Sequence, residues 1–83
     1  MTETAIGTVN HYFTKLSVAV VDLIGPLRLG DTIAVSGTHT DFAQKVTSMQ
    51  VDHQNIEAAQ AGQEVAIKLI QRARAGDTVL RVE

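Results

Sequence analysis

The stretches "LRLGDTIAV" (residues 27–35) and "ARAGDTVLRV" (residues 73–82) share the pattern Arg-x-Gly-Asp-Thr followed by apolar residues. Glycine adopts positive φ at no steric cost, and an Asp beside it can accept a hydrogen bond from a nearby backbone N–H. Threonine is β-branched and favours the start of a strand. The pattern therefore predicts a tight turn followed by a strand at both places, with Gly30 and Asp31 in the first turn and Gly76 and Asp77 in the second.

A weaker version of the same pattern, with Gly62 in the turn, occurs in "AGQEVAI" (residues 61–67). The flanks of the two full copies argue against a duplicated module. Ile33 corresponds to Val79, but two residues later the first copy has a valine and the second has Arg81. We therefore interpret the repeats as one turn chemistry used at several corners of a single fold.

The remaining chain is predicted to consist of short strands. Gly7 predicts a bulge or bend in the first strand. In the fourth strand the apolar residues do not all fall on one face, so we expect this strand either to contain a bulge or to turn its other face to the core. The Ala-rich residues 54–61 favour at most one short helical turn, which Gly62 would end. The predicted strands are residues 5–13, 16–24, 31–36, 42–53, 64–71 and 78–82.

About six strands, with turn signals every 8–12 residues or so, predict an all-β fold. We expect a small closed or nearly closed antiparallel β-barrel, because closure removes exposed strand edges. At 83 residues the chain is expected to be a single domain, residues 1–83.

Composition and charge narrow the class of protein. The chain has no cysteine and 45% hydrophobic residues, so the core must be aliphatic and no disulfide is available. A homo-oligomer that buries further apolar surface is compatible with this. No basic start precedes an apolar run, and the longest apolar stretch, from Val18, is closed by Asp22. These features predict a soluble cytoplasmic protein with no membrane contact.

The net charge of −2 differs from the basic excess of general nucleic-acid binders, but the charge is unevenly distributed. Lys68, Arg72, Arg74 and Arg81 form a local basic run near the end of the chain. Because Lys68, Arg72 and Arg74 share parity along an extended chain, they could line one face together with Ile70. Such an edge could contact RNA or an acidic partner; the alternative is an ordinary solvated strand face.

The sequence favours neither catalysis nor a bound cofactor. The three histidines, His11, His39 and His53, could form a metal site only if the fold gathered them, because no pair has the spacing of ligands on one element. No serine lies in a Gly-x-Ser-x-Gly elbow. We therefore expect no catalytic, cofactor or metal residue, and a protein that is not an enzyme.

The order of these motifs resembles the second domain of elongation factor Tu-type translational GTPases, and more narrowly the small stand-alone proteins labelled translation elongation factor-like. The matching segments are "IGTV" (6–9), "LRLGDTIAVSG" (27–37), "QKVTSMQVDHQNIEAAQAGQEVAIKL" (44–69) and "RAGDTVL" (74–80). The GTPase motifs of that family, Gly-x4-Gly-Lys-Ser/Thr and Asn-Lys-x-Asp, are missing, so GTP hydrolysis is not implied.

The resemblance implies a non-catalytic binding module that contacts RNA or a protein of the translation machinery, with Lys68, Arg72 and Arg74 as its binding residues. The alternative left open by the residues is a protein–protein interaction or oligomerisation domain with no nucleic-acid role. The acidic net charge and the few aromatic residues favour this alternative.

Overall fold

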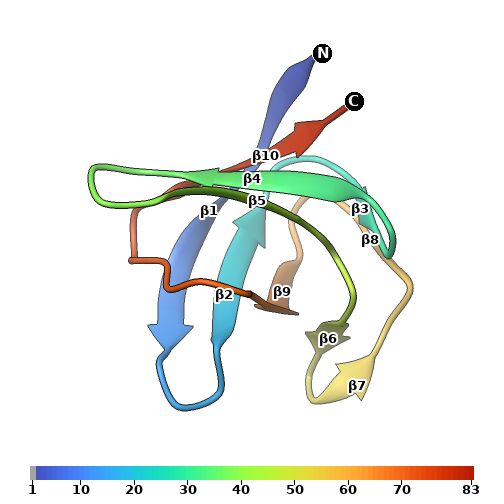
Figure 1. Ribbon diagram of the computed structural model, residues 1–83. Coiled ribbons are helices and arrows are strands. Elements are labelled where there is room, and N and C mark those ends of the chain that lie inside the picture. The colour runs from blue at the N-terminus through green and yellow to red at the C-terminus, as the bar shows by residue number, and fades with distance from the viewer. Residues whose placement is uncertain (1) are drawn as a thin grey trace.

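The computed structural model describes residues 2–83, and this part of the chain is all-β with no helix, so none is available to cross a membrane (Figure 1). Buried and exposed side chains alternate along most of the longer strands, as a sheet with one face on a core requires. The strands are β1 (Glu3–Phe13), β2 (Val18–Leu23), β3 (Leu27–Arg28), β4 (Thr32–Ser36), β5 (Asp41–Lys45), β6 (Met49–Val51), β7 (Gln54–Asn55), β8 (Ala58–Ala59), β9 (Glu64–Lys68) and β10 (Thr78–Val82).

Eight of the strands form one antiparallel sheet in the order β5-β4-β10-β1-β2-β9-β6-β7, and β3 pairs separately with β8. The sheet curls strongly in Figure 1 and encloses one cluster of buried side chains, among them Ile33, Val35, Ile67 and Val79. The expected all-β antiparallel fold is confirmed. The expected barrel is not, because no ladder joins the end strands β5 and β7 and the sheet is not closed.

β1 is the longest strand and pairs with both β10 and β2 by changing register along its length. In the β1–β10 ladder the register shifts between Ala5 and Gly7, so the bulge lies at Gly7, where the sequence predicted it. A Cβ on Gly7 would lie 2.7 Å from Val21 Cγ1 and 2.8 Å from the carbonyl oxygen of Asp22. Only glycine therefore allows β2 to approach β1 this closely.

The sequence allowed at most one helical turn at residues 54–61; the segment has none and contains β7 and β8 instead. Alanine favours helix in isolation, but here Ala59 is buried and pairs with the equally buried Leu27 across the β3–β8 ladder. Tertiary burial thus outweighs a small local preference. The predicted strand 42–53 is also divided, into β5 and β6.

Three turns, at residues 28–31, 60–63 and 74–77, have the same construction. Their third residues, Gly30, Gly62 and Gly76, have φ of +90°, +90° and +96°. In each turn the fourth residue's N–H donates to the first residue's C=O, at 3.1, 3.2 and 3.0 Å in chain order. The fourth residue's side chain also accepts from the first residue's N–H, at 3.0, 2.7 and 2.8 Å. This is the geometry of a type II turn, reinforced by one side chain.

The gap between β5 and the segment that follows β9, which we call the seam, is bridged by the side chain of Gln44. This glutamine lies on β5 with the inward parity of Phe42 and is only 9% exposed. Its Nε2 donates to the carbonyl oxygen of Lys68 at 2.9 Å, and its Oε1 accepts from the N–H of Ile70 at 2.7 Å. One side-chain amide thus replaces a rung of backbone pairing between β5 and the segment that follows β9.

A second close contact joins the turn after β4 to the turn before β10. Asp77 is buried, with its Oδ2 accepting from the N–H of Arg74 at 2.8 Å. A Cβ on Gly37 would overlap the other carboxylate oxygen of Asp77. Gly37 is therefore required for the Asp77 turn to pack against the β4–β5 connection.

Replacing Gln44 is expected to open the seam. Gln44→Leu keeps the volume but leaves the Lys68 carbonyl and the Ile70 N–H without partners, so the free energy of unfolding should fall by about 2 kcal/mol or more. Urea denaturation measures this. The matched control is Gln50→Leu, which removes an exposed side-chain bond to Asn55 at 3.0 Å and should cost about 0.5 kcal/mol or less. Equal losses in the two variants would contradict the bridging role of Gln44.

Gly37→Ala is expected to lower the free energy of unfolding by about 1–3 kcal/mol, because the added methyl group displaces a buried carboxylate. The test is a double-mutant cycle with Asp77→Ala, which removes the group that the methyl meets. The double variant should lose about 1 kcal/mol less than the sum of the single losses. If the two losses of unfolding free energy were strictly additive, there would be no steric conflict between residue 37 and the Asp77 carboxylate.

Candidate functional site

A hollow of about 510 Å³ lies along the seam that Gln44 bridges. One side comes from β5 and the residues after it, and the other from the end of β9 and the residues that follow. We call this hollow the seam groove; it is lined by Gln44, Lys45, Thr47, Lys68, Leu69 and Ile70. Because the Gln44 amide holds both sides, the groove is shaped by the same contact that fastens β5 to the segment after β9.

Apolar side chains are exposed beside this groove. β9 keeps Ile67 in the core, but Ile70, just past its end, is 70% exposed. The N–H of Leu69 donates to the carbonyl of Ser17 at 2.8 Å, which sets the turn between β1 and β2 alongside. Leu16 in that turn is 64% exposed. Two neighbouring segments therefore present large aliphatic groups to solvent, which is the composition of a contact surface.

The charges of the seam groove are all positive. Lys45 and Lys68 line it from opposite sides, and no acidic residue is among its lining residues. Neither lysine forms an ion pair within residues 2–83, where the ion pair formed is that of Arg81 with Glu83. Both ammonium groups are thus available to a ligand that carries a carboxylate.

The structure separates the three basic residues that the sequence analysis grouped. Lys68 lines the seam groove, whereas Arg74 lines a different hollow of about 450 Å³, together with His39. Arg72 is exposed next to the buried Ala73. Because β9 ends at Lys68, the alternation of an extended strand does not continue to the arginines. Lys45, which the sequence analysis did not single out, is the cation that shares the groove with Lys68.

The histidines occupy separate places. His11 lies on β1, where its ring meets that of Phe13 edge-on with centroids 4.5 Å apart. His39 is in the β4–β5 turn, and His53 is in the β6–β7 turn with φ of +64°. Within residues 2–83, no three His, Asp or Glu side chains are grouped as metal ligands would be.

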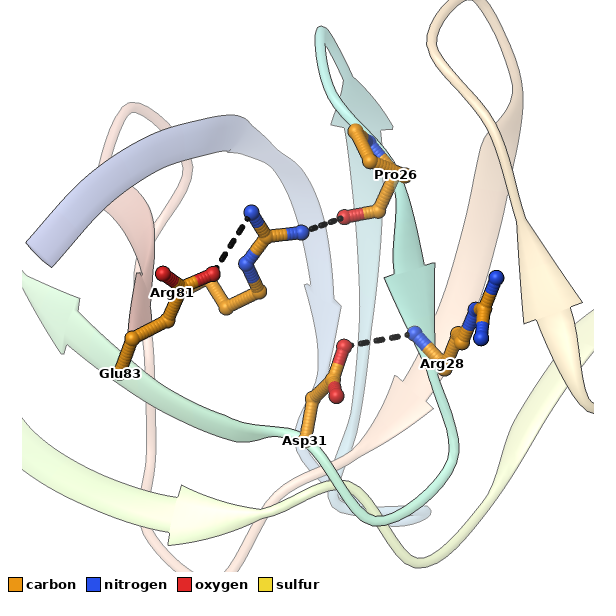
Figure 2. A network of polar contacts seen from close by, with 5 residues as sticks. All are labelled: Pro26, Arg28, Asp31, Arg81 and Glu83. Carbon is orange, nitrogen blue, oxygen red and sulfur yellow. Dashed lines mark hydrogen bonds and ion pairs between the residues drawn. The ribbon is translucent and has the colours of Figure 1, made fainter.

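Arg81 belongs to a structural clamp and lines neither the hollow of Lys68 nor that of Arg74. It has the inward parity of Val79 on β10, and its Nη1 donates to the carbonyl oxygen of Pro26 at 3.2 Å (Figure 2). Its Nη2 lies 3.0 Å from Glu83 Oε1. The nearby Asp31 carboxylate instead accepts from the N–H of Arg28, as Figure 2 also shows. Arg81 thus fastens the last strand to the connection between β2 and β3.

Comparison with known proteins finds similarity to proteases. No protein-family model matches the chain. An uncharacterised protease of Methanocaldococcus jannaschii is 40% identical over 75 residues, which is 89% of this chain and 18% of that protein. Two Porphyromonas gingivalis collagenases are each 31% identical, over 98% and 94% of this chain and 23% and 19% of their own length. The chain thus spans about a fifth of the length of these curated relatives.

Solved structures show the same fold. Two crystal structures of the C-terminal domain of a Geobacillus thermoleovorans protein assigned to the U32 peptidases superpose with TM-scores of 0.89 and 0.86. Sequence identity is 21% and 22%, and the superpositions cover 98% and 90% of this chain and 93% and 95% of those chains.

The resemblance to elongation factor Tu-type domains is therefore wrong, and with it the function in translation. The similar proteins are proteases and collagenases. The reason lies in the motifs that carried the resemblance. The Gly-Asp turns at residues 28–31 and 74–77 are built from one glycine φ and one side-chain hydrogen bond each. Such turns recur wherever two strands must be joined tightly, so their order along a chain does not identify a family.

Proposed function

We propose that this chain is a domain of a U32 peptidase-related protein and that it serves there as a non-catalytic docking domain for polypeptide. The supporting observation is the extent of the similarity. The matches cover 89–98% of this chain but only 18–23% of the proteins named protease or collagenase. A unit of this size and fold has also been crystallised as the C-terminal domain of a U32 peptidase-like protein.

Such a domain would contribute by holding a polypeptide close to chemistry performed elsewhere in the protein. Linking a weak binding site to a second site turns the second encounter into an intramolecular one, with effective concentrations around the millimolar range for short linkers. The seam groove suits this role, because it combines exposed aliphatic groups with two unpaired lysines. This proposal develops the protein–protein interaction alternative and assigns the protein no role with RNA.

A domain replacement in the Porphyromonas gingivalis collagenase tests this function. Three forms are compared on denatured collagen and on a short fluorogenic peptide: the intact enzyme, the enzyme without its matching segment, and the enzyme with this chain in its place. Deletion should lower kcat/KM for denatured collagen roughly tenfold or more while sparing the short peptide, because only the long substrate reaches a docking site. This chain should restore most of the loss.

The control places an unrelated β-domain of similar size in the same position. If that domain restores cleavage as well as this chain does, the role is that of a spacer and the proposal fails. Peptide hydrolysis by the isolated 83-residue chain would also contradict a non-catalytic role. Its activity should equal the buffer blank on both substrates.

A further inference from the structure

The outer edge of β5 borders the seam groove and has no partner strand. β5 pairs with β4 on one side only and ends the sheet. Gly37 and Thr40 exchange both backbone hydrogen bonds at the turn, at 2.8 and 3.4 Å. In an antiparallel ladder the bonded pairs then recur at every second residue, so Phe42 and Gln44 direct their backbone groups toward β4. Ala43 and Lys45 direct theirs outward.

An unpaired strand edge of this kind accepts an extended peptide by adding a strand. The edge is partly protected, because the Lys45 carbonyl already accepts from Gln44 Nε2 at 3.2 Å. No such bond covers the backbone groups of Ala43, whose side chain is small and exposed. A peptide can therefore approach the β5 edge near Ala43 without steric obstruction from that side chain.

The lining of the groove restricts which peptide fits. Lys45 and Lys68 flank it, while Asp41, the acid of β5, lies at the opposite end of the strand and outside the lining. Ile70 lines the same groove and is 70% exposed, and the adjacent Leu69 is bonded to the Leu16 turn. Charge complementarity thus requires a carboxylate in the ligand, and the exposed aliphatic groups require a large apolar side chain on the same face of the ligand.

We propose that the seam groove binds an extended polypeptide segment in which an acidic residue and a large aliphatic one are separated by one residue, so that both side chains lie on the same face. The backbone of the segment pairs with the outer edge of β5, its carboxylate lies between Lys45 and Lys68, and its aliphatic side chain packs on Ile70. The inference rests on the proposed function, since it names the kind of segment that the docking domain holds.

Fluorescence polarisation tests this with a labelled nonapeptide, Gly-Thr-Glu-Thr-Leu-Thr-Glu-Thr-Gly, and the full chain. Binding should saturate and weaken severalfold when salt is raised from about 0.05 M to about 0.5 M, because exposed charges are screened. The peptide with Gln in place of both Glu should bind roughly fivefold to tenfold more weakly, as expected for two exposed ion pairs. N-methylation of backbone groups that face β5 should cost roughly fivefold or more.

Variants of the chain locate the site. Lys45→Gln with Lys68→Gln should weaken binding as much as the neutral peptide does, and Ile70→Ser should weaken it further. Arg74→Gln is the matched control, because Arg74 is exposed and lines a separate hollow; it should change the Kd by less than about twofold. All these side chains are exposed, so their thermal unfolding should match that of the unchanged chain.

Three results would overturn the inference: no saturable binding up to about 1 mM peptide, equal affinity for the neutral peptide, or equal loss in the Arg74 control and the lysine variant. Failure of the groove proposal can be distinguished from failure of the proposed docking function. If the chimeric collagenase is restored but the lysine variant binds normally, docking stands and the groove is wrong. If the peptide binds as expected but the chimera is not restored, the groove stands and the docking function is wrong.

Discussion

One side-chain amide holds the end strand β5 against the segment that follows β9. The eight-stranded sheet is open, and Gln44 reaches across from β5 to hold the Lys68 carbonyl and the Ile70 N–H. A backbone ladder at this place would have paired the β5 edge along its length. A single side chain fastens β5 to the segment after β9 and leaves the outer edge of β5 unpaired beside a groove. A buried amide without partners costs about 1–3 kcal/mol per group, so the position tolerates neither an apolar residue nor a shift of either segment.

Much of the local structure can be predicted from the residues. β10 spans the predicted residues, Thr78–Val82, and begins at the threonine that follows the Gly-Asp turn. The bulge at Gly7 follows from the one glycine of the first strand. Closure cannot be predicted in this way, because it depends on pairing between segments far apart in the sequence. The helical preference of residues 54–61 failed for the same reason, since the burial of Ala59 against β3 is a tertiary contact.

The candidate site was only partly predictable. Lys68 was found because it belongs to a local run of basic residues, but its partner in the groove, Lys45, comes from another strand. The bridging role of Gln44 could have been predicted from its position in the sequence. Gln44 lies on the buried face of "FAQKV", between Phe42 and Val46, and a polar side chain there needs a buried partner. Arg81 has the same kind of position, because it shares the inward face of Val79.

The most direct test of docking at the seam is an NMR titration of the ¹⁵N-labelled chain with the acidic nonapeptide. It reports the contacted backbone amides one by one without altering the protein. Docking at the seam predicts the largest shift changes at residues 43–47 and 68–70, on the two sides that Gln44 joins. Changes concentrated at residues 37–39 and 74–77, around the hollow of Arg74, would contradict the account.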